Sequence, residues 1–124
     1  MNQLQDNVTI FQEWCEQQLA GIAKMENEKD NNSYEAPHDL MLLQGKRSVL
    51  EYFIGESKFH AKRYRNPNAE SLESAKGMLE VARMELEEHR AKKKVHNHFT
   101  LKHARSLGRY SMLCDIERKL LSLE

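Results

Sequence analysis

The sequence predicts an all-α protein, a bundle of about four helices in a single domain, and three observations support this. Apolar residues recur at three- and four-residue steps along most of the chain, which is the spacing of one helix face. Alternation at period two never persists, and the Asn-Gly and Asp-Gly pairs that mark hairpins are absent. The two prolines, Pro37 and Pro67, each follow a polar stretch and precede a helical pattern, so they divide the chain into segments. The length of 124 residues suits one domain.

We expect helices over residues 3–27, 37–65, 68–94 and 100–123, with breaks near residues 28–36, 66–68 and 95–99. Asn68, directly after Pro67, is the expected N-cap of the third helix. The apolar positions that define the four helices are, in chain order, Val8, Phe11, Cys15, Leu19 and Ile22; Leu43, Leu50, Ile54, Ala61 and Tyr64, widened by Leu42, Val49 and Phe53; Leu72, Ala75, Leu79, Ala82 and Leu86; and Leu107, Tyr110, Met112, Leu113, Cys114, Ile116, Leu120 and Leu121.

All five glycines fall inside the predicted helices, where each costs about 1 kcal/mol relative to alanine. Close contact between helices explains them best. The alternative is that one or two mark real breaks, with Gly55 and Gly108 the strongest candidates.

The composition indicates a cytoplasmic protein without a membrane segment. The N-terminal stretch lacks the basic and apolar regions of a signal peptide, and the longest apolar run, Leu40 to Leu43, is far too short to span a bilayer. The two cysteines, Cys15 and Cys114, both lie among apolar residues, where a thiol behaves as a small hydrophobe. This usage fits a reducing compartment better than a disulfide framework.

Charge is strongly segregated although the chain is neutral overall, with 19 basic and 19 acidic residues. Residues 1–40 carry a balance of −6 (two bases, eight acids), and residues 66–88 carry −4 (two bases, six acids). Residues 89–110 carry +7, with seven bases and no acid. Such blocks create local fields that the neutral total conceals.

The basic block predicts a site for a phosphate-bearing partner, because Lys and Arg neutralise phosphate charge and release counterions. The expected site residues are Arg90, Lys92, Lys93, Lys94, His96, His98, Lys102, His103, Arg105 and Arg109. Amides of the first helical turn after Thr100 would add donors, and protonated histidines would strengthen binding as the pH falls toward 6. A secondary basic face comprises Lys58, Lys62, Arg63 and Arg65. The plainer interpretation is that these charges only solvate helix ends.

Two other interpretations of the same region are weaker. The histidines do not match the ligand spacings of known zinc sites, so no metal or other cofactor is expected. Residues 100–111 resemble the first helix and turn of a helix-turn-helix, with Ala104 under the second helix and Gly108 in the turn. An uninterrupted, mostly buried helix accounts for the same residues and is favoured, because Asp115 and Glu117 lie where phosphates would approach.

No pattern typical of an enzyme is present: we find no Gly-rich phosphate loop, Ser-His-Asp set or paired-cysteine motif. We therefore expect a non-enzymatic binding or regulatory protein that recognises an anionic ligand or nucleic acid where the third helix meets the fourth. The alternative is an adaptor or inhibitor, of the kind found as accessory proteins of phages and mobile elements, that binds a protein through its helix faces. The Leu/Ala seam of the third helix and the apolar end of the fourth also predict a homo-oligomer.

Overall fold

The computed structural model describes residues 3–28, 36–96 and 100–124, and within them it forms four helices. These are α1 (Gln3–Glu28), α2 (Ala36–Arg63), α3 (Pro67–His96) and α4 (Leu101–Ser122). No strand occurs in these ranges. The predicted all-α four-helix bundle is therefore confirmed.

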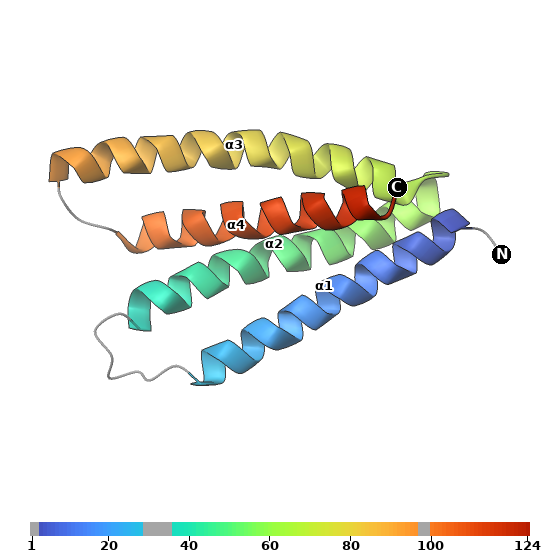
Figure 1. Cartoon of the computed structure of the whole chain (residues 1–124), viewed down its shortest axis with the longest axis horizontal. Helices are drawn as coiled ribbons and strands as arrows, with labels where there is room; N and C mark the ends of the chain where they lie inside the picture. Colours follow the sequence, from blue (N-terminus) through green and yellow to red (C-terminus); the bar gives the residue numbers. More distant parts are fainter. Residues whose placement is uncertain (1–2, 29–35, 97–99) are drawn as a thin grey trace.

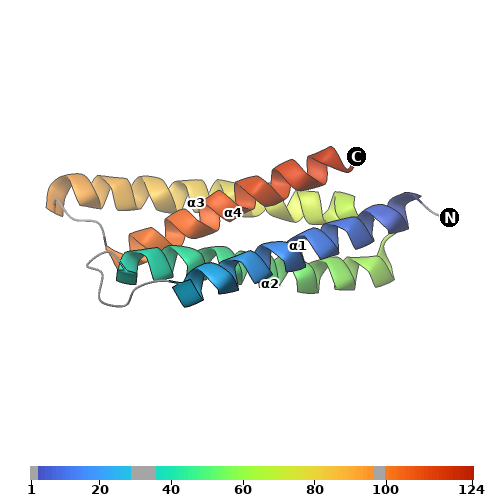
Figure 2. The ribbon, with the colours of Figure 1, turned by 60° about the horizontal axis from the view of Figure 1, so that its bottom comes forward.

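The helices run up and down along a common long axis (Figure 1). α4 packs mainly against α2 and α3, and α1 packs mainly against α2. The view in Figure 2 shows α1 lying along α2, while α4 crosses the direction of α3. One end of the bundle holds the α3–α4 connection, and the other holds the start of α1, the α2–α3 connection and the end of α4.

The core is apolar and draws on all four helices, as the predicted stripes require. Its fully buried side chains include Phe11 of α1, Phe53 of α2 and Ile116 of α4. The Leu/Ala seam of α3 is also internal, with Leu72, Ala75, Ala82 and Leu86 buried and Leu79 partly buried. Leu113, Ile116 and Leu120 of α4 are buried in the same core. Most of the residues from which we expected a homo-oligomer are thus covered by the chain itself, although Leu121 is exposed. The oligomer stays an untested prediction.

The prediction for the second half of α2 is wrong. Ala61 and Tyr64 are exposed, and Ser57 and His60 occupy the buried positions of these turns. The helix also ends at Arg63, not at Arg65. Helical phase explains the error, because a buried face that contains Phe53 continues through residues 57 and 60 at steps of four and three.

Close helix contact explains two of the five glycines. A Cβ on Gly108 would lie 2.0 Å from the Leu42 carbonyl oxygen, and one on Gly45 would lie 2.2 Å from the Arg105 carbonyl oxygen. α2 and α4 therefore approach backbone to backbone at this crossing. Gly108 and Gly55 both lie inside continuous helices, so neither is a break, and the helix-turn-helix interpretation is wrong. At Gly21, Gly55 and Gly77 a Cβ would meet nothing within 4 Å, so helix contact does not explain these three.

The cap of α3 is Asn66, not Asn68. The Asn66 side-chain oxygen accepts a hydrogen bond from the Ala69 amide at 3.3 Å, and its carbonyl accepts from the same amide at 3.2 Å. Pro67 then occupies the first helical position, where its missing N–H costs nothing. Asn68 is left inside the first turn and is buried.

Candidate anion-binding site

The predicted basic region lies at the end of the bundle where α3 and α4 are connected (Figure 1). Its exposed members come from both helices, and they are Arg90, Lys92, Lys93, Lys102 and Arg105. The side chains of Lys94 and His96, in the last turn of α3, and the whole of His98 lie outside the described residues. The exposed members extend over about one turn near the end of α3 and about one turn near the start of α4.

The end of α3 and the start of α4 carry little negative charge of their own. Lys92 pairs with Glu88 one turn earlier, with Nζ and Oε1 3.1 Å apart, but both side chains are exposed and such a pair contributes little. Arg90, Lys102 and Arg105 form no ion pair with any residue that the structure describes. No Asp or Glu occurs between Glu88 and Asp115 in the sequence. The end of α3 and the start of α4 are therefore positive at their surface, while the end of α1, which carries Glu26 and Glu28, lies at the same end of the bundle.

Arg83, by contrast, lies further back on α3 and is neutralised by its own helix. It pairs with Glu80 and Glu87, the glutamates three residues before it and four after it.

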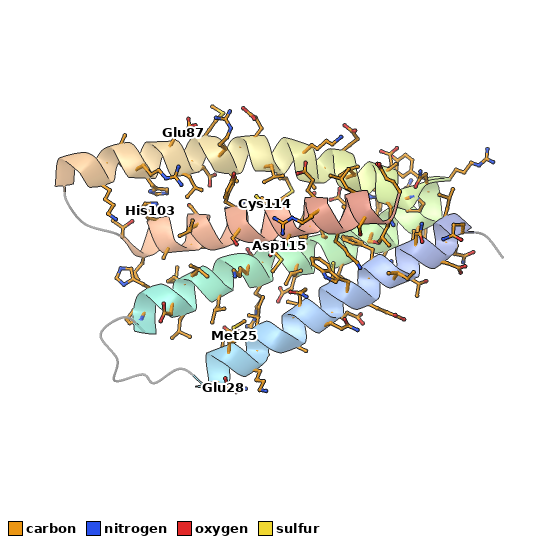
Figure 3. The ribbon with its side chains drawn as sticks, viewed as in Figure 1. Met25, Glu28, Glu87, His103, Cys114 and Asp115 are labelled. Carbon is orange, nitrogen blue, oxygen red and sulfur yellow. The ribbon has the colours of Figure 1, made fainter. Side chains whose placement is uncertain are left out.

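His103 does not present its ring to the surface, although we predicted it as a surface donor. It is 6 % exposed, and its ring stacks on that of His89 of α3, with centroids 5.2 Å apart and planes 11° apart. Figure 3 labels it at the start of α4. Burial lowers the pKa of His103, and the nearby His89, Lys93 and Arg90 lower it further. His103 therefore becomes positively charged only at a lower pH than an ordinary histidine does.

The partner of His103 is also tied to α4. His89 Nε2 lies 3.2 Å from the Ser106 hydroxyl, so α3 and α4 are joined by a ring stack and a hydrogen bond at the same level. The lowered pKa shows that Arg90 and Lys93 lie close enough to the stack to repel a charge on it. The two histidines hold the basic ends of α3 and α4 together.

The first turn of α4 is capped within the chain. The Thr100 hydroxyl accepts a hydrogen bond from the His103 amide at 3.0 Å, in the geometry of an N-cap. One of the amides that we expected to face an anion is therefore already satisfied. The positive end of the α4 dipole still adds to the field of the surrounding side chains.

Arg109 lies apart from the exposed cations. It is partly buried, and it lines a groove of about 330 Å³ together with Tyr52 of α2 and Glu73 and Glu85 of α3. Met78 and Val81 form part of the apolar lining of this groove. Arg109 thus belongs to a mixed groove between α2 and α3, about 10 Å along α4 from Lys102.

The secondary basic face lies at the opposite end of the bundle. Lys58, Lys62, Arg63 and Arg65 are all exposed around the end of α2. The Arg63 guanidinium lies 4.6 Å from the centre of the Phe59 ring, a cation–π contact. The length of α3 from residue 67 to residue 90 separates the two basic surfaces by about 35 Å, at about 1.5 Å per residue. One small ligand cannot contact both.

A buried chain of polar contacts between α2 and α3 was not predicted. Ser71 Oγ lies 3.1 Å from His60 Nδ1, and His60 Nε2 lies 3.4 Å from a Glu56 carboxylate oxygen. The same carboxylate accepts a hydrogen bond from Ser74. A serine, a histidine and a glutamate in line are typical of nucleophilic catalysis, but Ser71 has no exposed surface for a substrate to reach. This chain of contacts therefore joins the two helices. The only hint in the sequence was the four-residue spacing of Glu56 and His60.

Among the described residues, no three His, Cys, Asp or Glu side chains gather as ligands for a metal ion. None of the helices described is long and apolar enough to cross a membrane. Comparison with known proteins adds no assignment: no family model, no curated protein and no solved structure matches this chain.

Proposed function

We propose that this chain is a small, non-enzymatic binding protein that recognises nucleic acid through the exposed cations where α3 meets α4. The observation that carries the proposal is the set Arg90, Lys93, Lys102 and Arg105. All four are exposed, they come from two helices at one end of the bundle, and no acid lies between Glu88 and Asp115 in the sequence. A surface that carries several cations attracts anions and raises their local concentration.

An extended polyanion suits this arrangement better than a small anion. The cations lie on the outside of two helices, and small anions bind best where several donors converge in an enclosed site. Phosphates repeat along a nucleic acid, so each exposed cation can find its own partner.

Fluorescence anisotropy with a labelled 20-base-pair DNA duplex tests the proposal. Four phosphate contacts predict a slope of about −3.6 for the logarithm of affinity against the logarithm of salt concentration, at about 0.9 per contact. Affinity should then fall roughly 150-fold between 50 and 200 mM salt. The double variant Lys102→Glu, Arg105→Glu should flatten the slope to about −1.8 and weaken binding at every salt concentration.

The matched control carries the same change of charge at the other end of the molecule. Lys58→Glu with Lys62→Glu also replaces two exposed cations of one helix. If binding depends on the α3–α4 end, the control should retain most of the affinity. Equal losses in both double variants would show a response to net charge alone, and a duplex that does not bind at 50 mM salt would refute the proposal. Melting temperatures of both variants check that folding is unchanged, since exposed charges contribute little to stability.

Protein binding through a helix face remains the second candidate, and the groove between α2 and α3 favours it. Its apolar lining includes Met78 and Val81, and Val81, Met84 and Tyr52 are each about half exposed or more. A partner helix held there by apolar contacts would bind with little dependence on salt. The salt series therefore separates the two candidates.

A further inference from the structure

A polar pocket of about 300 Å³ lies at the end of the bundle opposite the α3–α4 connection. Three helix ends meet there: the start of α1, the start of α3 and the end of α4. Amide side chains form its polar wall, namely Gln3, Asn7, Asn66 and Asn68, and Leu120 and Leu123 form part of its apolar wall. The volume is at the lower limit of the range of small-molecule sites.

Three of the four amides already have partners inside the protein. The Asn7 side chain donates to the Leu123 carbonyl at 2.7 Å and accepts from the Gln3 amide at 3.2 Å. Asn66 caps α3 through its side-chain oxygen. These bonds join α1 to the end of α4 and fix the start of α3, so they shape the pocket.

Asn68 is the exception. It is 9 % exposed, and neither its side-chain nitrogen nor its side-chain oxygen has a hydrogen-bond partner among the described residues. Buried side-chain amides in folded proteins nearly always have partners, because burial removes the hydrogen bonds that water would supply. The carboxamide lies covered behind the wall of the pocket, and a ligand that reached it would supply both missing hydrogen bonds.

The charge of the pocket restricts the class of ligand. No Lys, Arg or His lines it, and the one charged lining residue is Glu124, so an anion would be repelled. A carboxamide offers a donor and an acceptor side by side, and its complement is a planar group with an acceptor next to a donor, as in the pairing of Asn with adenine. Leu120 can cover the apolar face of such a ring.

We propose that this pocket binds an uncharged, planar molecule with an adjacent hydrogen-bond donor and acceptor, of the nucleobase or aromatic carboxamide type, with Asn68 as its bidentate partner. The ligand reaches the covered amide by displacing part of the wall. Leu123 and Glu124 follow the end of α4 and are held to it by one backbone hydrogen bond each, to Leu120 and Leu121. Their displacement breaks these two bonds and the hydrogen bond from Asn7 to the Leu123 carbonyl. The site is independent of the basic end of the bundle.

Titration of the ¹⁵N-labelled protein with adenine, followed by NMR, tests this proposal. We expect saturable shifts at the Asn68 side-chain amide and at the backbone amides of Ala69 and Leu123. Purine has the same ring but lacks the amino donor, so it should bind roughly tenfold or more weakly, as expected for loss of a bidentate pair. Nicotinamide, an aromatic carboxamide, tests the second ligand type in the same NMR titration.

Asn68→Leu should weaken adenine binding by a similar factor, whereas Gln17→Leu, on an exposed part of α1, should leave it unchanged. Asn68→Asp retains the shape and the acceptor but loses the donor, and it serves if the leucine variant does not fold. The proposal is wrong if none of the three compounds shifts these signals at millimolar concentration, the result expected if one buried water satisfies the amide. It is equally wrong if adenine binds the wild type and a folded Asn68 variant with the same affinity.

Discussion

Replacement of Gly108 by alanine tests the close crossing of α2 and α4 most directly. The new methyl carbon would lie 2.0 Å from the Leu42 carbonyl oxygen and 2.8 Å from the Leu42 carbonyl carbon. Both atoms are backbone, so no side chain can turn away to make room. The helices must separate by at least about 1.5 Å for the contact to reach an ordinary distance of roughly 3.5 Å.

Two effects of opposite sign determine the result. Alanine in a helix is favoured over glycine by about 1 kcal/mol. Forcing a methyl group into a well-packed contact costs about 1 to 3 kcal/mol, and occasionally more. The α2–α4 contact is the most extensive in the bundle, so its separation should cost at least the upper part of that range. We expect Gly108→Ala to lower the free energy of unfolding by about 1 to 2 kcal/mol.

The same substitution at Gly21 or Gly55 provides the matched control, because a Cβ there meets nothing within 4 Å. These variants gain the helix preference of alanine over glycine without the clash. Each should therefore raise the free energy of unfolding by about 0.5 to 1 kcal/mol. Urea unfolding followed by circular dichroism at 222 nm measures all three variants. If Gly108→Ala is as stable as Gly21→Ala, the helices do not approach as closely as described here.

Two further predictions concern titration and thiol chemistry. The pKa of His103 is lowered chiefly by burial and next by His89, so the unfolded chain binds a proton before the folded one does, and stability should fall as the pH drops from 6.5 toward the folded pKa. His103→Gln should reduce this loss in urea unfolding at pH 7 and pH 5, whereas an unchanged difference would show that another group is responsible. Burial raises the pKa of Cys15 to about 12, with a smaller effect from Glu16, and Cys114 is only partly buried. A disulfide reagent at pH 8 should therefore label Cys114 in the folded protein and Cys15 only after urea is added, and equal rates in the absence of urea would contradict this.

The helices could be predicted because their signals are local. Three- and four-residue spacing and two prolines located every segment, and the predicted bounds of α1 differ from the observed ones by one residue at the C-terminal end. Errors arose where two nearby residues suited the same local role equally well. Asn66 and Asn68 flank Pro67 and both suit an N-cap, but only the first allows Pro67 to occupy the first helical position. The buried residue that results, Asn68, has no signature in a single sequence.

The predicted site was less accurate than the fold, because a run of basic residues does not specify direction. Charge counting placed His103 and Arg109 with their neighbours, but along α4 each residue turns about 100° from the one before it. Lys102 and Arg105 consequently point to the surface, and His103 turns inward to stack on His89. Arg109 shares the helix face of Lys102 and Arg105 but lies about 10 Å further along α4 from Lys102, where it lines the groove with Tyr52 and the α3 residues. The exposed cations, and not the complete run, are therefore the residues whose reversal should affect a bound polyanion. For this reason the charge-reversal test uses Lys102 and Arg105.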